Sequence, residues 1–237
     1  MKKRILMYML LSLVTCALSA QVVADRKVMW DYPVKPESKE WRETSYIEKI
    51  KKSQPPKELL KNWTSEVLFQ YCINYPFNKV ILLFNNPNDG FKRVYEQSSV
   101  WQEFIQRKDA IDVLTKYLES RPYKRLFTIN NIESRNNELF IVFFLDKIVS
   151  ETDFAANLDV RNRKKLTNII LQNHQSKKNY PEEFTGFHYN SSLSAMLKVS
   201  GDEKSLTGLR EKTDNEFFID ENEEASIIKK VINFINK

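Results

Sequence analysis

The stretch SEVLFQYCINYPFNKVILLFNN, residues 65–86, decides the fold class. Apolar and aromatic side chains in its first half recur at i, i+1, i+4, i+5 and i+8, which places them in one continuous stripe on a helix. The members of this stripe are Val67, Leu68, Tyr71, Cys72 and Tyr75. Thr64 is a good N-cap for the helix, and Pro76 breaks or kinks it. The following FNKVILLF is predicted to pack as a second apolar segment.

Glycine is rare along the whole chain. Its four positions are Gly90, Gly186, Gly201 and Gly208. Hairpin-rich β proteins need turn residues with positive φ far more often, and no sustained alternation of apolar and polar residues occurs. We therefore expect an all-α fold: a single domain over residues 25–237, built as stacked antiparallel helical hairpins or a short α-α superhelix.

The apolar periodicity predicts further helices along the chain. They cover residues 39–52, 91–97, 100–107, 109–120, 158–175 and 190–199. The run ELFIVFFLDKIV, residues 138–149, predicts a central buried helix, with a buried strand as the alternative. Asp220 and Glu223 predict a capped final helix. Residues 85–90 are expected to form a turn, and residues 201–215 a loop with at most one turn of helix.

The first 24 residues have the pattern of a secretory signal peptide. Met1 and three basic residues precede an apolar run, which ends in small residues with cleavage expected after Ala20 or Ala24. The run falls short of the roughly 20 residues of a spanning helix. The chain is therefore expected to be exported, to the periplasm or the cell surface.

Lipid attachment at Cys16 is the alternative to simple cleavage. The sequence Leu13-Val14-Thr15-Cys16 roughly imitates a lipoprotein box, although Thr15 fits poorly before such a cysteine. A membrane tether is expected only if Cys16 is lipidated.

Charge gives little indication of a partner. The full chain has a formal net charge of +6, and removal of the three basic residues at its start leaves 34 basic and 31 acidic residues. These charges are interspersed along the chain, which is typical of a solvated surface and not of a nucleic-acid-binding stripe. No nucleic-acid partner is expected.

Residues that could carry out catalysis are scarce. Cys72 shares the apolar stripe, and no cationic residue lies within one helical turn to lower its pKa, so it is interpreted as core packing. His174 is expected at the margin of the core, and His188 in a turn near Ser191 and Ser192, without the pattern of a serine hydrolase. The sequence predicts no catalytic residue, no metal site and no cofactor.

Three aromatic residues near the mature N-terminus form the candidate partner-binding site: Trp30, Tyr32 and Trp41. Trp30 and Tyr32 lie in an extended, proline-containing strap at about residues 28–38, and Trp41 follows it. Exposed aromatic residues are good interface anchors, but such a strap more often buries its aromatics on its own domain. Both interpretations stay open.

A set of short motifs between residues 32 and 117 carries a resemblance: Tyr32-Pro33, Pro36, Trp41, Gln54-Pro55, Thr64-Ser65-Glu66, Cys72-Ile73-Asn74-Tyr75-Pro76, Gly90-Phe91, Arg107-Lys108-Asp109-Ala110, Leu114 and Tyr117, and more weakly Gly186 and residues 191–197. In these residues the chain resembles a family of uncharacterised exported proteins of Bacteroides-type bacteria. The chain departs at Ser98-Ser99, where similar proteins carry Phe-Asn-Gly. The resemblance implies export and a helical fold and leaves the activity open.

The favoured function is a non-enzymatic binding or scaffold protein of the cell envelope, whose partner is a protein, a peptide or an envelope component. The alternative is a hydrolase of an envelope or dietary polymer that uses carboxylates brought together by the fold. The adjacent pairs Glu182-Glu183 and Glu223-Glu224 could contribute carboxylates, although neighbouring residues do not face one site and solvated surface is their expected setting.

Overall fold

The computed structural model describes residues 30–180, 182–184, 186–213 and 219–237. Every regular element within these ranges is a helix, which confirms the predicted all-α fold. The α-helices are α2 (Lys39–Glu43), α3 (Tyr46–Lys52), α4 (Lys57–Asn62), α5 (Ser65–Ile73), α6 (Pro87–Glu96), α7 (Ser99–Ile105), α8 (Ala110–Glu119), α9 (Tyr123–Leu126), α10 (Ile132–Glu151), α11 (Val160–Lys177), α12 (Gly186–Ser200), α13 (Glu203–Thr213) and α14 (Glu221–Asn236). The 3₁₀ helices are η1 (Asn78–Leu83) and η2 (Asp153–Asn157). The predicted signal peptide, Cys16 and the start of the strap lie outside the described residues.

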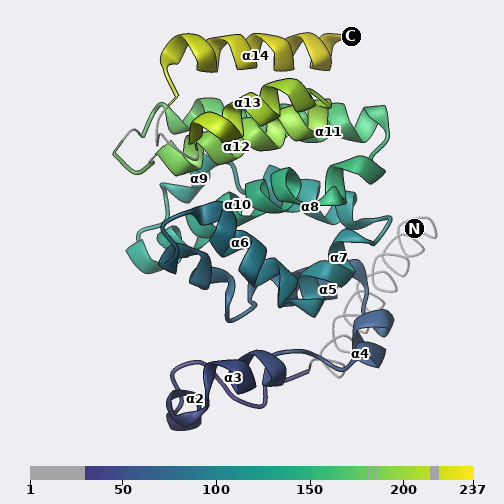
Figure 1. Ribbon diagram of the computed structural model, residues 1–237, viewed down its shortest axis with the longest axis vertical. Coiled ribbons are helices and arrows are strands. Elements are labelled where there is room, and N and C mark those ends of the chain that lie inside the picture. Colours follow the sequence, from purple (N-terminus) through teal and green to yellow (C-terminus); the bar gives the residue numbers. More distant parts are fainter. Residues whose placement is uncertain (1–29, 181, 185, 214–218) are drawn as a thin grey trace, which may run out of the picture.

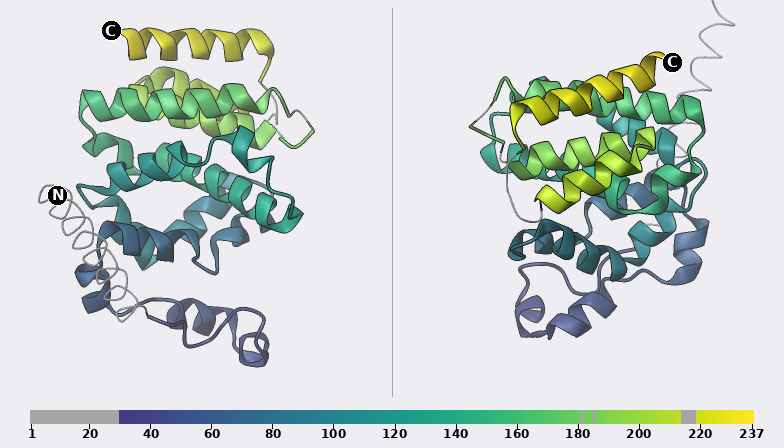
Figure 2. Two further views of the ribbon diagram at one scale, coloured as in Figure 1. Left: turned by 180° about the vertical axis from the view of Figure 1, so that it is seen from behind. Right: turned by 45° about the horizontal axis from the view of Figure 1, so that its top comes forward.

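The chain advances along the long axis of the molecule in successive layers (Figure 1). α2 and α3 form one end, followed by α5 to α7, by α8 and α10, by α11 to α13, and by α14 at the other end. The views in Figure 2 show the same order. α12 packs against α10, α11, α13 and α14 and so connects the upper layers. The finer predictions, stacked antiparallel hairpins or a superhelix within a single domain, stay predictions.

α10 is the central helix of the core. The strand alternative for residues 138–149 was wrong, because the whole run lies within this 20-residue helix. Asn131 caps it by accepting a hydrogen bond from the backbone N–H of Ser134 at 2.8 Å. Its side chains from Leu139 to Val149 are buried except that of Phe140, and each buried Leu, Ile or Phe contributes about 1.5–3 kcal/mol. No helix in the described part of the chain is long and apolar enough to cross a bilayer.

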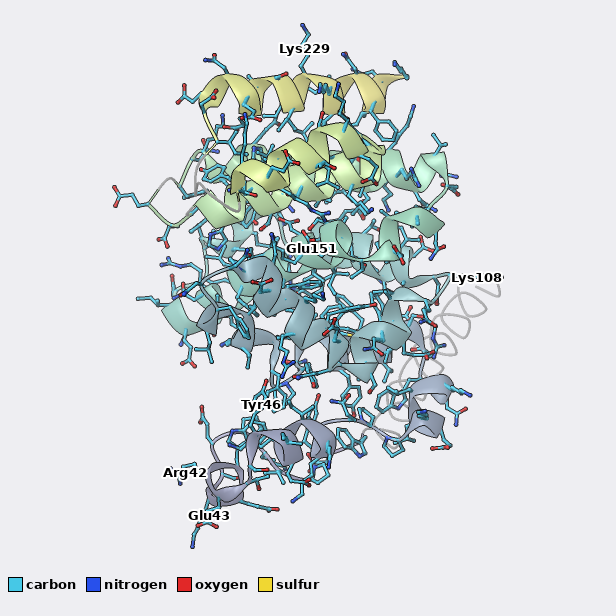
Figure 3. All side chains as sticks on the ribbon, in the orientation of Figure 1. Arg42, Glu43, Tyr46, Lys108, Glu151 and Lys229 are labelled. Carbon is cyan, nitrogen blue, oxygen red and sulfur yellow. The ribbon has the colours of Figure 1, made fainter. Side chains whose placement is uncertain are left out.

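The single helix expected at residues 39–52 is instead two short helices. Ser45 is extended (ψ 155°), and its side chain caps α3 by accepting a hydrogen bond from the N–H of Glu48 at 3.3 Å. Figure 3 shows Tyr46 directed toward the neighbouring layer, where its ring lies 5.6 Å from that of Phe77. Ser45 is a capping residue that favours a helix start at residue 46. The apolar period of residues 39–52 favoured one continuous helix instead.

The turn expected at residues 85–90 is also a helix start. Asn86 accepts a hydrogen bond from the N–H of Asn88 at 2.8 Å, and Pro87 occupies the first turn of α6, where its missing N–H costs nothing. Residues 201–215 were wrongly expected to form a loop. α13 lies there, with Asp202 accepting a hydrogen bond from the N–H of Ser205 at 3.1 Å.

The N-terminal cap of the final helix, α14, was predicted correctly from the sequence. Asp220 accepts a hydrogen bond from the N–H of Glu223 at 2.9 Å, as the capping pattern predicted. Ile227 and Val231 of α14 are buried against the layer below, while Ile232 remains 38% exposed. The apolar stripe of α14 is therefore only partly covered.

Candidate functional site

The principal candidate site is a cavity of about 360 Å³ between η1, the start of α6, α10 and the start of α12. We call it the apolar cavity. Its lining residues are Ile81, Leu82, Phe84, Pro87, Asn136, Leu139, Phe140, Phe143, Glu183 and His188. Small-molecule sites are typically concave, mostly apolar and about 300–1,000 Å³ in volume, with a few polar groups at their edge.

The geometry of η1 creates one wall of the apolar cavity. A 3₁₀ helix has three residues per turn, so residues i and i+3 lie above each other. Asn78 and Ile81 are both buried on this repeat, whereas Leu82 and Leu83 are 64% and 81% exposed. The prediction that FNKVILLF packs as an apolar segment is therefore correct for Ile81 but wrong for the three residues after it, which present apolar side chains to solvent at the edge of the cavity.

The opposite wall is aromatic. Phe140 and Phe143 of α10 lie with ring centroids 6.3 Å apart, and the Phe143 ring lies 5.3 Å from the imidazole of His188. His188 was expected in a turn, but it belongs to the first turn of α12. Burial and the positive charge of Lys177 lower the pKa of His188 to about 4, so its ring is neutral at pH 7.

A buried polar network lies directly behind His188. Lys177 of α11 is 1% exposed, and its ammonium donates hydrogen bonds to the carbonyl of His188 and to Oγ of Ser192, the latter at 2.9 Å. Its Nζ lies 3.8 Å from Oδ2 of Asp146, which projects from α10. Burial lowers the pKa of Lys177 and raises that of Asp146, and each charge partly offsets the cost of burying the other.

The network continues through His174 to the last helix. His174 Nδ1 lies 2.7 Å from Oγ of Ser192, and its Nε2 lies 3.0 Å from Oε1 of Glu224 on α14. The hydrogen bond from His174, with a further contribution from Lys178, lowers the pKa of Glu224 to about 2, so this carboxylate is an acceptor only. We therefore assign the ring proton to Nε2, which leaves Nδ1 to accept from Ser192.

The hydrogen bonds of this network all run in one direction: Lys177 donates to Ser192, Ser192 donates to His174, and His174 donates to Glu224. We define the buried polar network as these four residues together with Asp146. It joins α10, α11, α12 and α14. Because Ser192 is 1% exposed and His174 is 0% exposed, a substrate cannot reach the hydroxyl in this arrangement. The network stabilises the contacts between the helices and presents no accessible nucleophile.

The carboxylate pairs named from the sequence do not form one site. Glu223 forms an ion pair with Lys212 at 2.6 Å, whereas Glu224 points inward to His174. The expectation that Glu224 lies in solvated surface was wrong, since its side chain is 14% exposed. Within the described ranges no cluster of three or more His, Cys, Asp or Glu side chains has an arrangement that could hold a metal ion.

The three aromatic residues of the expected partner site are all partly buried against the core. The ring of Trp30 lies 4.8 Å from that of Tyr32, which in turn lies 6.2 Å from Tyr71. Trp41 packs separately, 5.5 Å from Phe77. Their role in binding a partner stays a prediction.

Cys72 lies in the core, 0% exposed, and burial raises its pKa well above the usual value. In a Cys16→Ser background, we expect iodoacetamide to label Cys72 at least on the order of a hundredfold more slowly in buffer than in urea, because access requires the helix to open. Mass spectrometry of time points measures both rates. Equal rates would contradict the assignment of Cys72 to core packing.

Comparisons with known proteins identify no relative of this chain. No family model matches the chain, and neither a curated protein nor a solved structure does.

Proposed function

We propose that this chain is an exported, non-enzymatic binding protein of the cell envelope, and that the apolar cavity holds the hydrocarbon chain of its ligand. One observation carries the proposal. Seven of the ten residues that line the 360 Å³ cavity are apolar, and its wall at η1 leaves Leu82 64% exposed.

Ligand burial supplies a reason for this arrangement. Covering a side chain such as Leu82 contributes up to about 1.5–3 kcal/mol, and large exposed apolar patches commonly mark binding sites. Export is proposed from the signal-like N-terminus, which places the protein among the lipids and polymers of an envelope.

We expect the uncharged fluorescent probe N-phenylnaphthylamine to bind saturably, and dodecanol to displace it. The substitution Leu82→Asp places a charge against the bound chain and is expected to weaken both affinities about tenfold or more, because desolvating a carboxylate is costly. Fluorescence titration of the folded protein measures both constants.

Leu83→Asp is the matched control. Leu83 is the next residue of η1, is 81% exposed and does not line the cavity. This variant should bind the probe within about twofold of the unsubstituted protein. Absence of saturable binding, or equal losses in the two variants, would contradict the proposed function.

A further inference from the structure

The polar side chains of the apolar cavity restrict the head group of its ligand. This inference rests on the proposed function. Three lining residues carry polar groups: the amide of Asn136, the carboxylate of Glu183 and the imidazole of His188. Glu183 is the one ionised side chain among the described lining residues, and its charge is negative.

His188 does not add a positive charge to the lining of the cavity. Its backbone carbonyl accepts a hydrogen bond from Lys177, whose buried ammonium lies behind the wall of the cavity. A proton on the His188 ring is disfavoured first by burial of the ring and then by repulsion from Lys177. The ring is also held in place between Phe143 and Phe184, whose centroids lie 5.3 and 5.5 Å away.

Glu183 retains capacity to accept hydrogen bonds from a ligand. Arg135 forms an ion pair with its Oε1 at 3.4 Å, and the Arg135 guanidinium, which also lies 5.8 Å from the ring centre of Phe127, is not among the groups that line the cavity. A carboxylate offers about four lone-pair positions on its two oxygens, so the ion pair with Arg135 does not exhaust them. The carboxylate is 39% exposed and can be reached from solvent.

We propose that the ligand is a single-chain amphiphile with an ammonium head group, which donates hydrogen bonds to Glu183 while its hydrocarbon chain occupies the apolar cavity. A carboxylate or phosphate head would lie beside Glu183 and face neutral His188. The negative charges of such a head group and of Glu183 repel each other. Anionic amphiphiles therefore bind less tightly than ammonium amphiphiles of equal chain length.

The test compares three head groups on one chain length. Dodecylammonium, dodecanol and dodecanoate, each below its micelle-forming concentration, compete with N-phenylnaphthylamine at pH 7 and low salt. We expect dodecylammonium to bind about tenfold more tightly than dodecanoate, equivalent to about 1.4 kcal/mol, with dodecanol between them. Dodecanoate binding as tightly as dodecylammonium would overturn the inference and leave the proposed function standing. Failure of all three to displace the probe would overturn both.

Glu183→Gln removes the charge while keeping the shape of the side chain. In this variant the affinities for dodecylammonium and dodecanol should differ by less than about twofold, and the affinity for dodecanol should stay as it was. Glu182→Gln is the matched control, because Glu182 is exposed and does not line the cavity. It should retain the full preference for ammonium. A preference that survives in Glu183→Gln, or disappears in Glu182→Gln, would overturn the assignment.

Discussion

Lys177→Met is expected to lower the free energy of unfolding by about 3–5 kcal/mol at pH 7, because it removes the positive charge that chiefly offsets the burial of the Asp146 carboxylate. The ammonium of Lys177 also contacts Ser192 and lies within 6 Å of three aromatic ring centres, of which the nearest is that of Tyr123 at 5.6 Å. Methionine keeps most of the length of the side chain but has no ammonium, so it restores neither the hydrogen bonds nor the ion pair. Urea unfolding followed by circular dichroism measures the loss.

The double variant Asp146→Leu/Lys177→Met separates the charge from the packing. Replacing a buried ion pair by apolar residues of similar volume is often neutral or stabilising, so the double variant should recover most of the stability lost by Lys177→Met. Two outcomes would contradict the role of the Asp146–Lys177 pair. One is a free energy of unfolding for Lys177→Met within 1 kcal/mol of the original protein, and the other is a double variant no more stable than Lys177→Met.

The pH dependence of the Lys177→Met defect has a defined sign. Burial raises the pKa of Asp146 in the folded protein, so its stabilising contribution is complete below the unfolded pKa and is lost as pH rises through the folded value. Without Lys177 this pKa rises further. The difference in stability between variant and original should therefore narrow as pH falls from 8 to about 5.

The parts of the fold that depend on local chemistry were predictable. Thr64 and Asp220 begin the helices that they were expected to cap, and Cys72 lies in the core as its position in the α5 stripe indicated. In each case a short-range pattern and the burial of its apolar face favour the same structure. The weaker signal of Asp202 and the pair Leu206 and Leu209 was overlooked, because charged residues dominate that stretch.

The buried polar network was not recognised, although part of its signal is present in the sequence. Leu166, Ile170, His174 and Lys177 follow the helical repeat, so Lys177 shares the core-facing stripe of α11. Asp146 similarly interrupts the apolar run of α10. A charge of each sign inside two apolar stripes suggests a buried pair. Its partners in α12 and α14 could not be inferred, because they depend on tertiary packing.

The apolar cavity could not be predicted for a different reason. The chain after Pro76 adopts a 3₁₀ repeat instead of the α-helical period, which changes the side chains that face inward. Hydrophobicity alone marks Ile81, Leu82 and Leu83 as equally buried. Only the geometry of η1 separates the buried first residue from the exposed pair.

Gly90→Ala is expected to destabilise the protein by about 3 kcal/mol, even though alanine is the better helix former. Gly90 lies in α6 where that helix crosses η1. A Cβ at this position would lie 2.7 Å from the carbonyl oxygen and 2.9 Å from Cα of Ile81. Both atoms belong to the backbone, so relief requires the two helices to separate. Thermal and urea unfolding measure the loss.

Gly208→Ala is the matched control, because an added Cβ on α13 meets no atom within 4 Å. It should stabilise the protein by about 0.5–1 kcal/mol through helix propensity alone. Ile81 and Phe84 both contact the position of the added Gly90 Cβ and both line the apolar cavity. Gly90→Ala should therefore also weaken binding of N-phenylnaphthylamine under conditions where the variant remains folded, whereas Gly208→Ala should leave it unchanged. A Gly90→Ala variant that is as stable as the original protein, or more stable, would contradict the close approach of η1 to α6.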